Sequence, residues 1–230
     1  MKKFLLMAVM VLTAATASAQ YEKGAITLQP KLGGNAAQLT GTKDIYTSYM
    51  EGGTVKLDKG LRSGSLIGVE AEYMLTEKLG LTAELNYSEQ GMRWVDADDG
   101  RNYIRNVETR LNYINMPFTA KYYVWKGLAV KAGLQFGYLV YAKNKMDNYE
   151  EYMTEHGVKV RRSKDVDEDI KSDCKKFDVA IPIGVSYEFC KHWVIDARYN
   201  IGLTKVNKQG DSMKNGVFTL AVGYKFRLVK

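Results

Sequence analysis

The fourteen C-terminal residues, VFTLAVGYKFRLVK, limit most strongly what this chain can fold into. Side chains alternate between the two faces of a β-strand, so this segment would present one apolar face and one small or charged face. The apolar face is long enough to cross a hydrocarbon layer, which takes about 9–11 residues of a tilted strand. The apolar positions are Phe218, Leu220, Val222, Tyr224, Phe226 and Leu228, and between them lie Thr219, Ala221, Gly223, Lys225 and Arg227.

The N-terminal nineteen residues have the pattern of a secretory signal peptide. Lys2 and Lys3 precede an apolar run over residues 4–15, and Ala17-Ser18-Ala19 is a small-residue cleavage site, so residues 1–19 are expected to be removed and the mature domain to span 20–230. The apolar run is shorter than the roughly 20 residues of a transmembrane helix, and no other segment approaches that length. A membrane-crossing strand behind an export signal predicts location in the outer membrane of a Gram-negative cell.

Eight segments of the mature chain show the alternating pattern. They cover residues 24–33, 64–75, 79–90, 110–125, 127–142, 177–189, 193–205 and 217–230. The connections are alternately short (76–78, 126 and 190–192) and long (34–63, 91–109, 143–176 and 206–214). Short periplasmic turns and longer extracellular loops are typical of outer-membrane barrels. The pattern predicts an all-β fold, an eight-stranded antiparallel up-and-down transmembrane β-barrel.

Alternation alone does not say which face points inward, and a soluble lipocalin-like barrel would place its apolar face inside. Tyrosine or tryptophan near the ends of the apolar face favours the membrane orientation, because these side chains suit the membrane–water interface. Charges of both signs on the other face suit a crowded, salt-bridged lumen. The expected lumen charges are Glu70, Glu72, Glu84, Lys121, Lys131, Asp178, Glu188, Asp196, Arg198, Lys225 and Arg227.

The chain is basic, with 33 Lys and Arg against 26 Asp and Glu. A basic balance can indicate nucleic acid or an anionic surface. The export signal argues against nucleic acid, and along the strands the charges alternate with apolar residues rather than forming one patch.

Four blocks of sequence, taken in order, resemble the porin-family outer-membrane β-barrel domain common in Bacteroidota. They are LNYINMPFTAKYYVWKGLAVKAGLQFGYLVYAK, FDVAIPIGVSYEF, VIDARYNIGLT and NGVFTLAVGYKF. The resemblance implies a small eight-stranded barrel of the OmpX and OmpA type, and it implies neither an activity nor conduction. The last strand also resembles the barrel-assembly signal at Gly223, Phe226 and Leu228, although Ala221 stands where that signal usually has a polar residue.

Few residues suggest chemistry. Two histidines, His156 and His192, are placed at opposite ends of the expected barrel, and no Ser-His-acid set accompanies them. The acidic stretch 96–100 departs from the EF-hand pattern, since its glycine falls at position 5 and Val107 occupies position 12. We therefore expect no catalytic residues, no metal site and no cofactor. Cys174 and Cys190 flank a full strand, which holds them roughly 40 Å apart, so two free thiols are expected.

The third long connection contains a basic cluster, Lys159, Arg161, Arg162 and Lys164, followed by the acidic run Asp165, Asp167, Glu168 and Asp169. It could bind a partner or lipopolysaccharide phosphates, or it could be a self-neutralising loop. A second open point is the occurrence of Pro30, Pro117 and Pro182 inside predicted strands, for which local bulges are the expectation.

These observations predict a monomeric structural or surface-interaction protein with a lumen closed by its own side chains. An eight-stranded barrel is only just wide enough for its interior side chains. The expected partners are outer-membrane lipid, lipopolysaccharide and the barrel-assembly machinery. A narrow porin for small solutes or ions is the alternative, and a lipid-modifying enzyme is a further one.

Overall fold

The computed structural model describes residues 22–41, 45–48, 54–95, 97–98, 102–153, 159–190, 192–210 and 212–229. Within these ranges the side chains of 45–48, 54–57, 97–98, 102–105, 147–153, 159–164 and 166 are not described. The expected signal peptide, residues 1–19, lies outside the described part.

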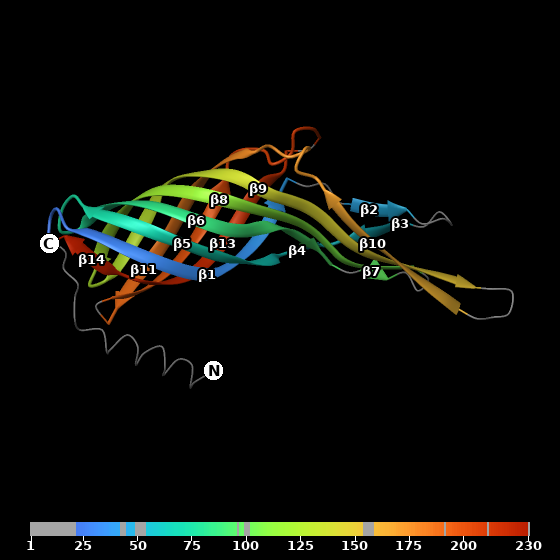
Figure 1. Ribbon diagram of the computed structural model, residues 1–230, viewed down its shortest axis with the longest axis horizontal. Coiled ribbons are helices and arrows are strands. Elements are labelled where there is room, and N and C mark those ends of the chain that lie inside the picture. The colour runs from blue at the N-terminus through green and yellow to red at the C-terminus, as the bar shows by residue number, and fades with distance from the viewer. Residues whose placement is uncertain are drawn as a thin grey trace.

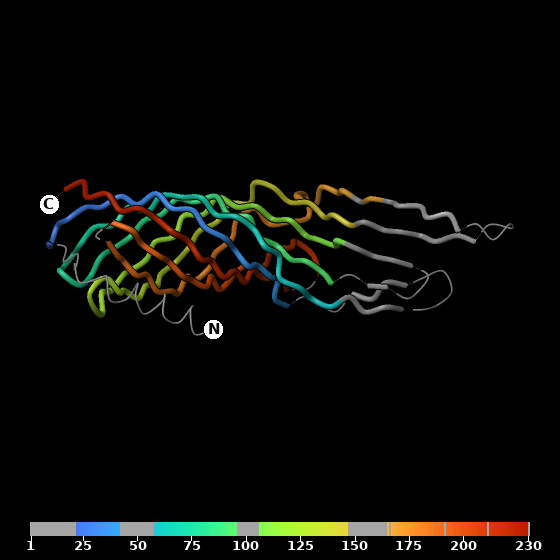
Figure 2. Tube along the Cα trace, turned by 90° about the horizontal axis from the view of Figure 1, so that it is seen from below, coloured from blue at the N-terminus to red at the C-terminus, as the bar shows by residue number. Residues whose placement is uncertain are grey.

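Eight long strands form a closed antiparallel ring (Figures 1 and 2). Around the ring, each strand pairs with the next in the order β9, β11, β12, β13, β1, β5, β6 and β8, and pairing of β8 with β9 closes it. The prediction of an eight-stranded antiparallel barrel is confirmed. The strands are β1 (Ile26–Thr40), β5 (Arg62–Met74), β6 (Leu79–Trp94), β8 (Asn102–Trp125), β9 (Leu128–Met153), β11 (Phe177–Phe189), β12 (Trp193–Gly202) and β13 (Lys214–Tyr224).

The two ends of the barrel differ. One end, called here the turn end, carries the short connections around residues 75–78, 126–127 and 190–192, together with β14 (Phe226–Val229), which continues β13 and pairs with β1. At the other end, called here the hairpin end, several strands run beyond the barrel (Figure 1). The additional strands are β2 (Ile45–Ser48), β3 (Thr54–Leu57), β4 (Lys59–Gly60), β7 (Ala97–Asp98) and β10 (Lys159–Asp169).

The long connections contain more strand than predicted. β9 continues to Met153 and pairs with β10 from Lys143↔Asp169 to Met153↔Lys159, so most of the expected third loop is a β-hairpin. β8 begins at Asn102 and β1 ends at Thr40, also beyond the expected limits. The prediction missed these extensions because they lie beyond the apolar band, where no hydrocarbon requires an apolar face and the alternation disappears. Of the basic cluster, the structure describes only the backbone.

Burial settles which face of the sheet is inside. Apolar side chains such as Leu32, Ile67 and Phe118 are exposed, whereas Gln29, Lys31 and neighbouring polar residues are buried. A water-soluble barrel has the opposite arrangement, so the lipocalin alternative is excluded. The part of the chain that the structure describes contains no helix long and apolar enough to cross a membrane.

The three prolines do not produce bulges. Instead, each proline lies at a two-residue gap in the pairing of its strand with one of the two neighbouring strands. The pairing register is the same on both sides of that gap. For Pro117, the β6–β8 pairs Ala83↔Phe118 and Asn86↔Asn115 lie in one register with the gap between them. The other ladder of each proline continues, as in the pairs Pro30↔Val69, Pro117↔Gln135 and Pro182↔Asn200. The expectation of local bulges was wrong, because losing one N–H donor interrupts a ladder without requiring an extra residue.

An apolar cluster lies inside the hairpin end. It combines residues from the ends of barrel strands with Cys174 and Val206 from the segments that fold inward there, and it comprises Leu39, Met92, Trp94, Leu111, Tyr113, Leu139, Ala142, Cys174 and Val206. We call it the hairpin-end cluster. Cys174 is buried within it, whereas Cys190 is exposed in a turn at the other end, and both thiols are free, as predicted.

Candidate functional site: an ion-pair network across the lumen

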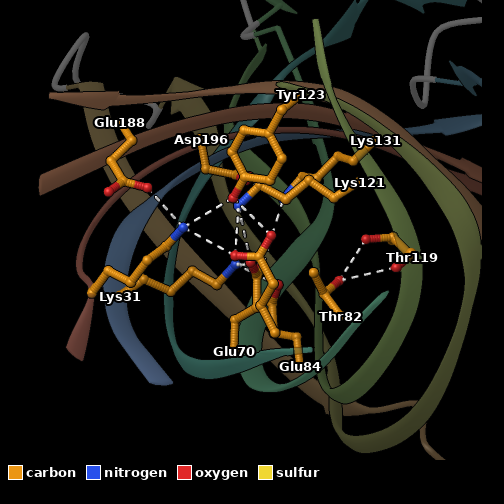
Figure 3. Close-up of polar contacts among 12 residues, drawn as sticks. Lys31, Glu70, Thr82, Glu84, Thr119, Lys121, Tyr123, Lys131, Glu188 and Asp196 are labelled. Atoms are coloured by element: carbon orange, nitrogen blue, oxygen red, sulfur yellow. Dashed lines mark hydrogen bonds and ion pairs between the residues drawn. The ribbon is translucent and has the colours of Figure 1, made fainter. Parts of the chain in front are cut away.

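The alternating pattern of each strand directs its charged residues into the barrel, where they meet (Figure 3). The side chains that form ion pairs in the lumen are each only 1% to 3% exposed. Charges this deeply buried are tolerated only when they are paired and hydrogen-bonded. The contacts fall into three groups, each centred on one glutamate.

Glu84 on β6 is the acceptor for three different side chains. Arg198 of β12 donates from both terminal nitrogens, Nη1 to Oε2 at 2.6 Å and Nη2 to Oε1 at 2.8 Å. Lys31 Nζ of β1 lies 2.5 Å from Oε2, and Asn86 donates to Oε1 at 2.7 Å. The paired Arg–carboxylate geometry is the strongest form of charge-assisted hydrogen bond.

Glu70 on β5 lies among three lysines. Its Oε2 accepts a hydrogen bond from Lys31 at 2.7 Å and lies 3.7 Å from the Nζ of Lys131, and its Oε1 lies 3.8 Å from the Nζ of Lys121. Lys131 also pairs with Asp196 of β12. Each of these lysines therefore links at least two strands.

Glu72 forms the group nearest the turn end. Its Oε2 lies 3.0 Å from the Nζ of Lys225 and 3.4 Å from the Nζ of Lys121, and its Oε1 accepts a hydrogen bond from the Tyr123 hydroxyl at 2.7 Å. Lys225 in turn pairs with Glu188 of β11 at 2.8 Å. The three groups share Lys31 and Lys121, so they form one network.

The network is balanced in charge. Its five cationic side chains are matched by five carboxylates, which suits burial because no net charge is left in the low-dielectric interior. The cations are Lys31, Lys121, Lys131, Arg198 and Lys225, and the carboxylates are Glu70, Glu72, Glu84, Glu188 and Asp196.

The network also crosses the full width of the lumen. In the ring order, β12 and β6 are four strands apart in either direction, so the Arg198–Glu84 pair joins opposite walls. The two residues are 114 positions apart in the sequence. Beside the network, the hydroxyls of Thr82 and Thr119 lie 2.6 Å apart on adjacent strands (Figure 3).

Of the eleven lumen charges expected from the sequence, all except Asp178 and Arg227 lie in this network. Asp178 is buried nearer the hairpin end, where Thr204 donates a hydrogen bond to it. Arg227 pairs with the lumen-facing Thr27 and so keeps the expected face of the sheet, but it is exposed rather than buried among the ion pairs described above. Beyond Tyr224, β14 pairs with β1 but no longer with β12, so Arg227 lies at the open rim.

Two members of the network were missed by sequence reasoning. Lys31 alternates with Thr27 and Gln29 on the polar face of its strand and could have been included on that ground. Tyr123 is two positions after Lys121, so alternation could have placed it on the same inner face, but it was assigned to neither face. Its hydroxyl, held between Glu72 and Lys225, explains its inward position.

The other sequence candidates lie elsewhere. Phe226 and Leu228 of the expected assembly signal are exposed on the outer surface, and Gly223 faces the lumen against the side chain of Gln29. His192 lies at the turn end, where its ring stacks on Tyr224 with centroids 5.2 Å apart.

His156 and the acidic residues Asp96 and Asp99 lie outside the described residues. Within the described part of the chain, no group of three or more His, Cys, Asp or Glu side chains has the arrangement of a metal site.

Known structures include similar barrels. Ail, the attachment invasion locus protein of Yersinia pestis, is 16% identical, with 89% of this chain and 99% of that chain covered and a TM-score of 0.47. Neisserial surface protein A is 15% identical over 89% and 100% of the two chains, with a TM-score of 0.42. OprG of Pseudomonas aeruginosa is 13% identical over 90% and 98%, with a TM-score of 0.43.

No curated protein matches the sequence. The sequence model for the outer membrane protein β-barrel domain matches residues 18–208, and the chain therefore belongs to this family of outer-membrane proteins.

Proposed function

We propose that this protein is a structural or surface-interaction barrel of the outer membrane, whose lumen is closed by its own ion pairs. The observation that carries the proposal is the Arg198–Glu84 pair, which joins opposite walls of the barrel with both side chains 1% exposed. A solute passing through would have to separate this buried pair and its neighbours.

The size of the barrel supports a closed lumen. With eight strands, the interior is about as wide as the side chains that fill it, whereas open aqueous channels occur at about 16–18 strands. Beyond the ion-pair network, the hairpin-end cluster adds an apolar layer on the path between the two ends. Any solute would therefore meet two different barriers.

The proposal includes the orientation and export of the chain. Residues 1–19 would direct export and be removed, the turn end would face the periplasm, and the hairpin end would lie outside the cell. The projecting β9–β10 hairpin and its neighbours then form the surface offered to partners, among them lipopolysaccharide. Phe226 and Leu228, exposed on the last strand, would be read by the barrel-assembly machinery.

Single-channel conductance in a planar bilayer tests the closed lumen. The folded protein, extracted from outer membranes and checked by heat-modifiable gel migration, should give no steady current. The double variant E84A/R198A, if it keeps heat-modifiable migration, should pass more current than the wild type, because it removes the crossing pair. Reproducible current steps from the wild type would establish the narrow porin instead.

The proposed role involves no enzymatic step. Lipid A from a deletion strain, compared with the parent by mass spectrometry, should show the same set of species. A modification that disappears on deletion and returns on complementation would establish the lipid-modifying alternative.

A further inference from the structure

Lysines gather at the hairpin end of one wall of the barrel. The chain that connects β10 to β11, residues 170–176, and the chain from the end of β12 to the first residue of β13, residues 203–214, contain six lysines against two aspartates. The lysines are Lys171, Lys175, Lys176, Lys205, Lys208 and Lys214, and the aspartates are Asp173 and Asp211. Asp211 lies outside the described residues. This part of the rim therefore has an excess of positive charge.

The backbone that carries these lysines is fixed to the barrel. The N–H of Lys175 donates to the carbonyl of Val206 at 2.6 Å, next to an antiparallel bridge between Cys174 and Asn207. Cys174 and Val206 are buried in the hairpin-end cluster. The two connections therefore lie side by side, with Lys175 bonded to the residue that follows Lys205.

The register of β11 and β12 places Lys205 on the outer surface. The Thr204 hydroxyl donates to Asp178 at 2.7 Å inside the barrel, which continues the register of the β11–β12 ladder. The residues on either side of this inner pair, Lys205 and Phe177, then stand opposite each other on the outer face. Both are exposed, as this arrangement requires.

Two further lysines lie diagonally from Lys205. Lys175 is exposed two positions before Phe177. On the other side, the continued register of the β12–β13 ladder places Lys214 opposite Leu203 on the outer face. Diagonal neighbours across a ladder are about 7–8 Å apart, a gap that long side chains span. The three ammonium groups of Lys175, Lys205 and Lys214, called here the rim lysines, can therefore reach a single headgroup.

The rim lysines have no anionic partner within the part of the chain that the structure describes. Their ammonium groups form neither an ion pair nor a hydrogen bond there. Lys143 on β9, by contrast, pairs with Asp167 at 3.0 Å, and Lys171 donates to the carbonyl of Val140 at 2.8 Å. Three like charges on neighbouring positions favour an anionic partner.

The outer surface on the turn-end side of the rim lysines is apolar. Phe177 is 73% exposed and contacts Tyr138 of β9 edge to face, with ring centroids 5.3 Å apart, and Leu203 is 43% exposed. Tyrosine is enriched where a membrane meets water. The rim lysines therefore lie where the apolar band ends, at the height of lipid headgroups.

We propose that the rim lysines bind the phosphate groups of lipopolysaccharide, whose acyl chains cover Phe177 and Leu203. A phosphorylated lipid matches both parts of this surface, because its phosphates suit the ammonium groups and its chains suit the apolar residues beside them. Free phosphate would leave the apolar part without a match. The inference rests on the proposed orientation, in which the hairpin end lies outside the cell and meets the leaflet that contains lipopolysaccharide.

Native mass spectrometry of the barrel released from nanodiscs counts the bound lipid. The folded protein from outer membranes is placed in phosphatidylcholine nanodiscs with increasing amounts of bisphosphorylated lipid A. We expect the wild type to retain lipid A. K175Q/K205Q/K214Q should bind it roughly a hundredfold more weakly, because each lysine beside an anionic lipid surface contributes about fivefold. K23Q/K78Q/K126Q removes three exposed lysines of the turn end and should bind lipid A as the wild type does.

Other lipids test the specificity. Lipid A without its phosphates and phosphatidylglycerol should both be retained less than bisphosphorylated lipid A. Equal retention of phosphatidylglycerol would overturn the proposal and indicate a general attraction of anionic lipid. Unchanged binding of lipid A by K175Q/K205Q/K214Q would also overturn it. If this variant fails to fold, K175Q and K205Q decide the outcome, since each should weaken binding about fivefold.

Cys190 tests the orientation separately, because it is exposed at the turn end. A maleimide too large to cross the outer membrane should label it only after the cells are lysed. Labelling in intact cells would overturn the proposed orientation, and with it lipopolysaccharide as the source of the phosphates, even if binding in nanodiscs remained. Absence of lipid A binding with Cys190 protected in intact cells would overturn the lipid site alone.

Discussion

Replacing Arg198 with methionine should destabilise the barrel by about 3 kcal/mol. The substitution removes both hydrogen bonds to Glu84, at 2.6 and 2.8 Å, and leaves a carboxylate that is 1% exposed. Breaking one side of a buried ion pair costs about 3–5 kcal/mol. We expect the lower end of this range because Lys31 Nζ, 2.5 Å away, and the Asn86 amide remain to compensate Glu84.

Urea unfolding in lipid vesicles, followed by tryptophan fluorescence, measures this loss. The double variant E84Q/R198M removes both charges, so we expect it to recover most of the stability lost in R198M. R227M is the matched control, because Arg227 is exposed at the rim, and its effect should stay within about 0.5 kcal/mol. If R198M were no less stable than R227M, the crossing pair would not have the energetic role assigned to it.

Three further outcomes are expected. Gly91→Ala should lower the unfolding midpoint, because φ at this position is 125° and an added Cβ would meet a strand carbonyl. A maleimide should label the folded protein once, at the exposed Cys190, and the unfolded protein twice, because burial raises the pKa of the Cys174 thiol. The hydrogen bond from Lys143 lowers the pKa of Asp167, so this pair stabilises the β9–β10 hairpin above about pH 4. The stabilisation is lost as the pH falls through the lowered pKa of Asp167, and reduced protection of the hairpin amides against hydrogen exchange should report the loss.

The barrel could be predicted from the sequence because a membrane imposes a simple rule on each strand. Hydrocarbon outside and a polar lumen inside force a period of two, and the pattern in residues 177–189 gave the limits of β11 to the residue. Where hydrocarbon ends, the rule ends, and the hairpin of β9 and β10 was taken for a loop. Strand pairing there depends on backbone hydrogen bonds, which have no signature in side-chain polarity.

Alternation predicts which face of each strand lines the lumen, but it does not predict which charged side chains pair across the lumen. Alternation places Glu84 and Arg198 inside, but it does not say that β6 and β12 stand opposite each other, which depends on strand number and ring closure. The exposure of Arg227 at the rim was not foreseen for a related reason, since alternation takes no account of where the neighbouring strand begins. The pairing of Tyr123 likewise depends on which strands face one another across the lumen.

The pairing of charges across the lumen has a consequence for how the barrel assembles. Arg198 and Glu84 lie on strands that meet only through the lumen, and the partners Lys225 and Glu72 are 153 residues apart. In a partly formed sheet Glu84 and Glu72 can still meet Lys31 and Lys121 of nearby strands, but Arg198 and Lys225 lack their partners across the lumen and stay hydrated until the last strands join. Ring closure is then the step at which the charges leave water together, which makes insertion cooperative and disfavours half-built barrels in the membrane.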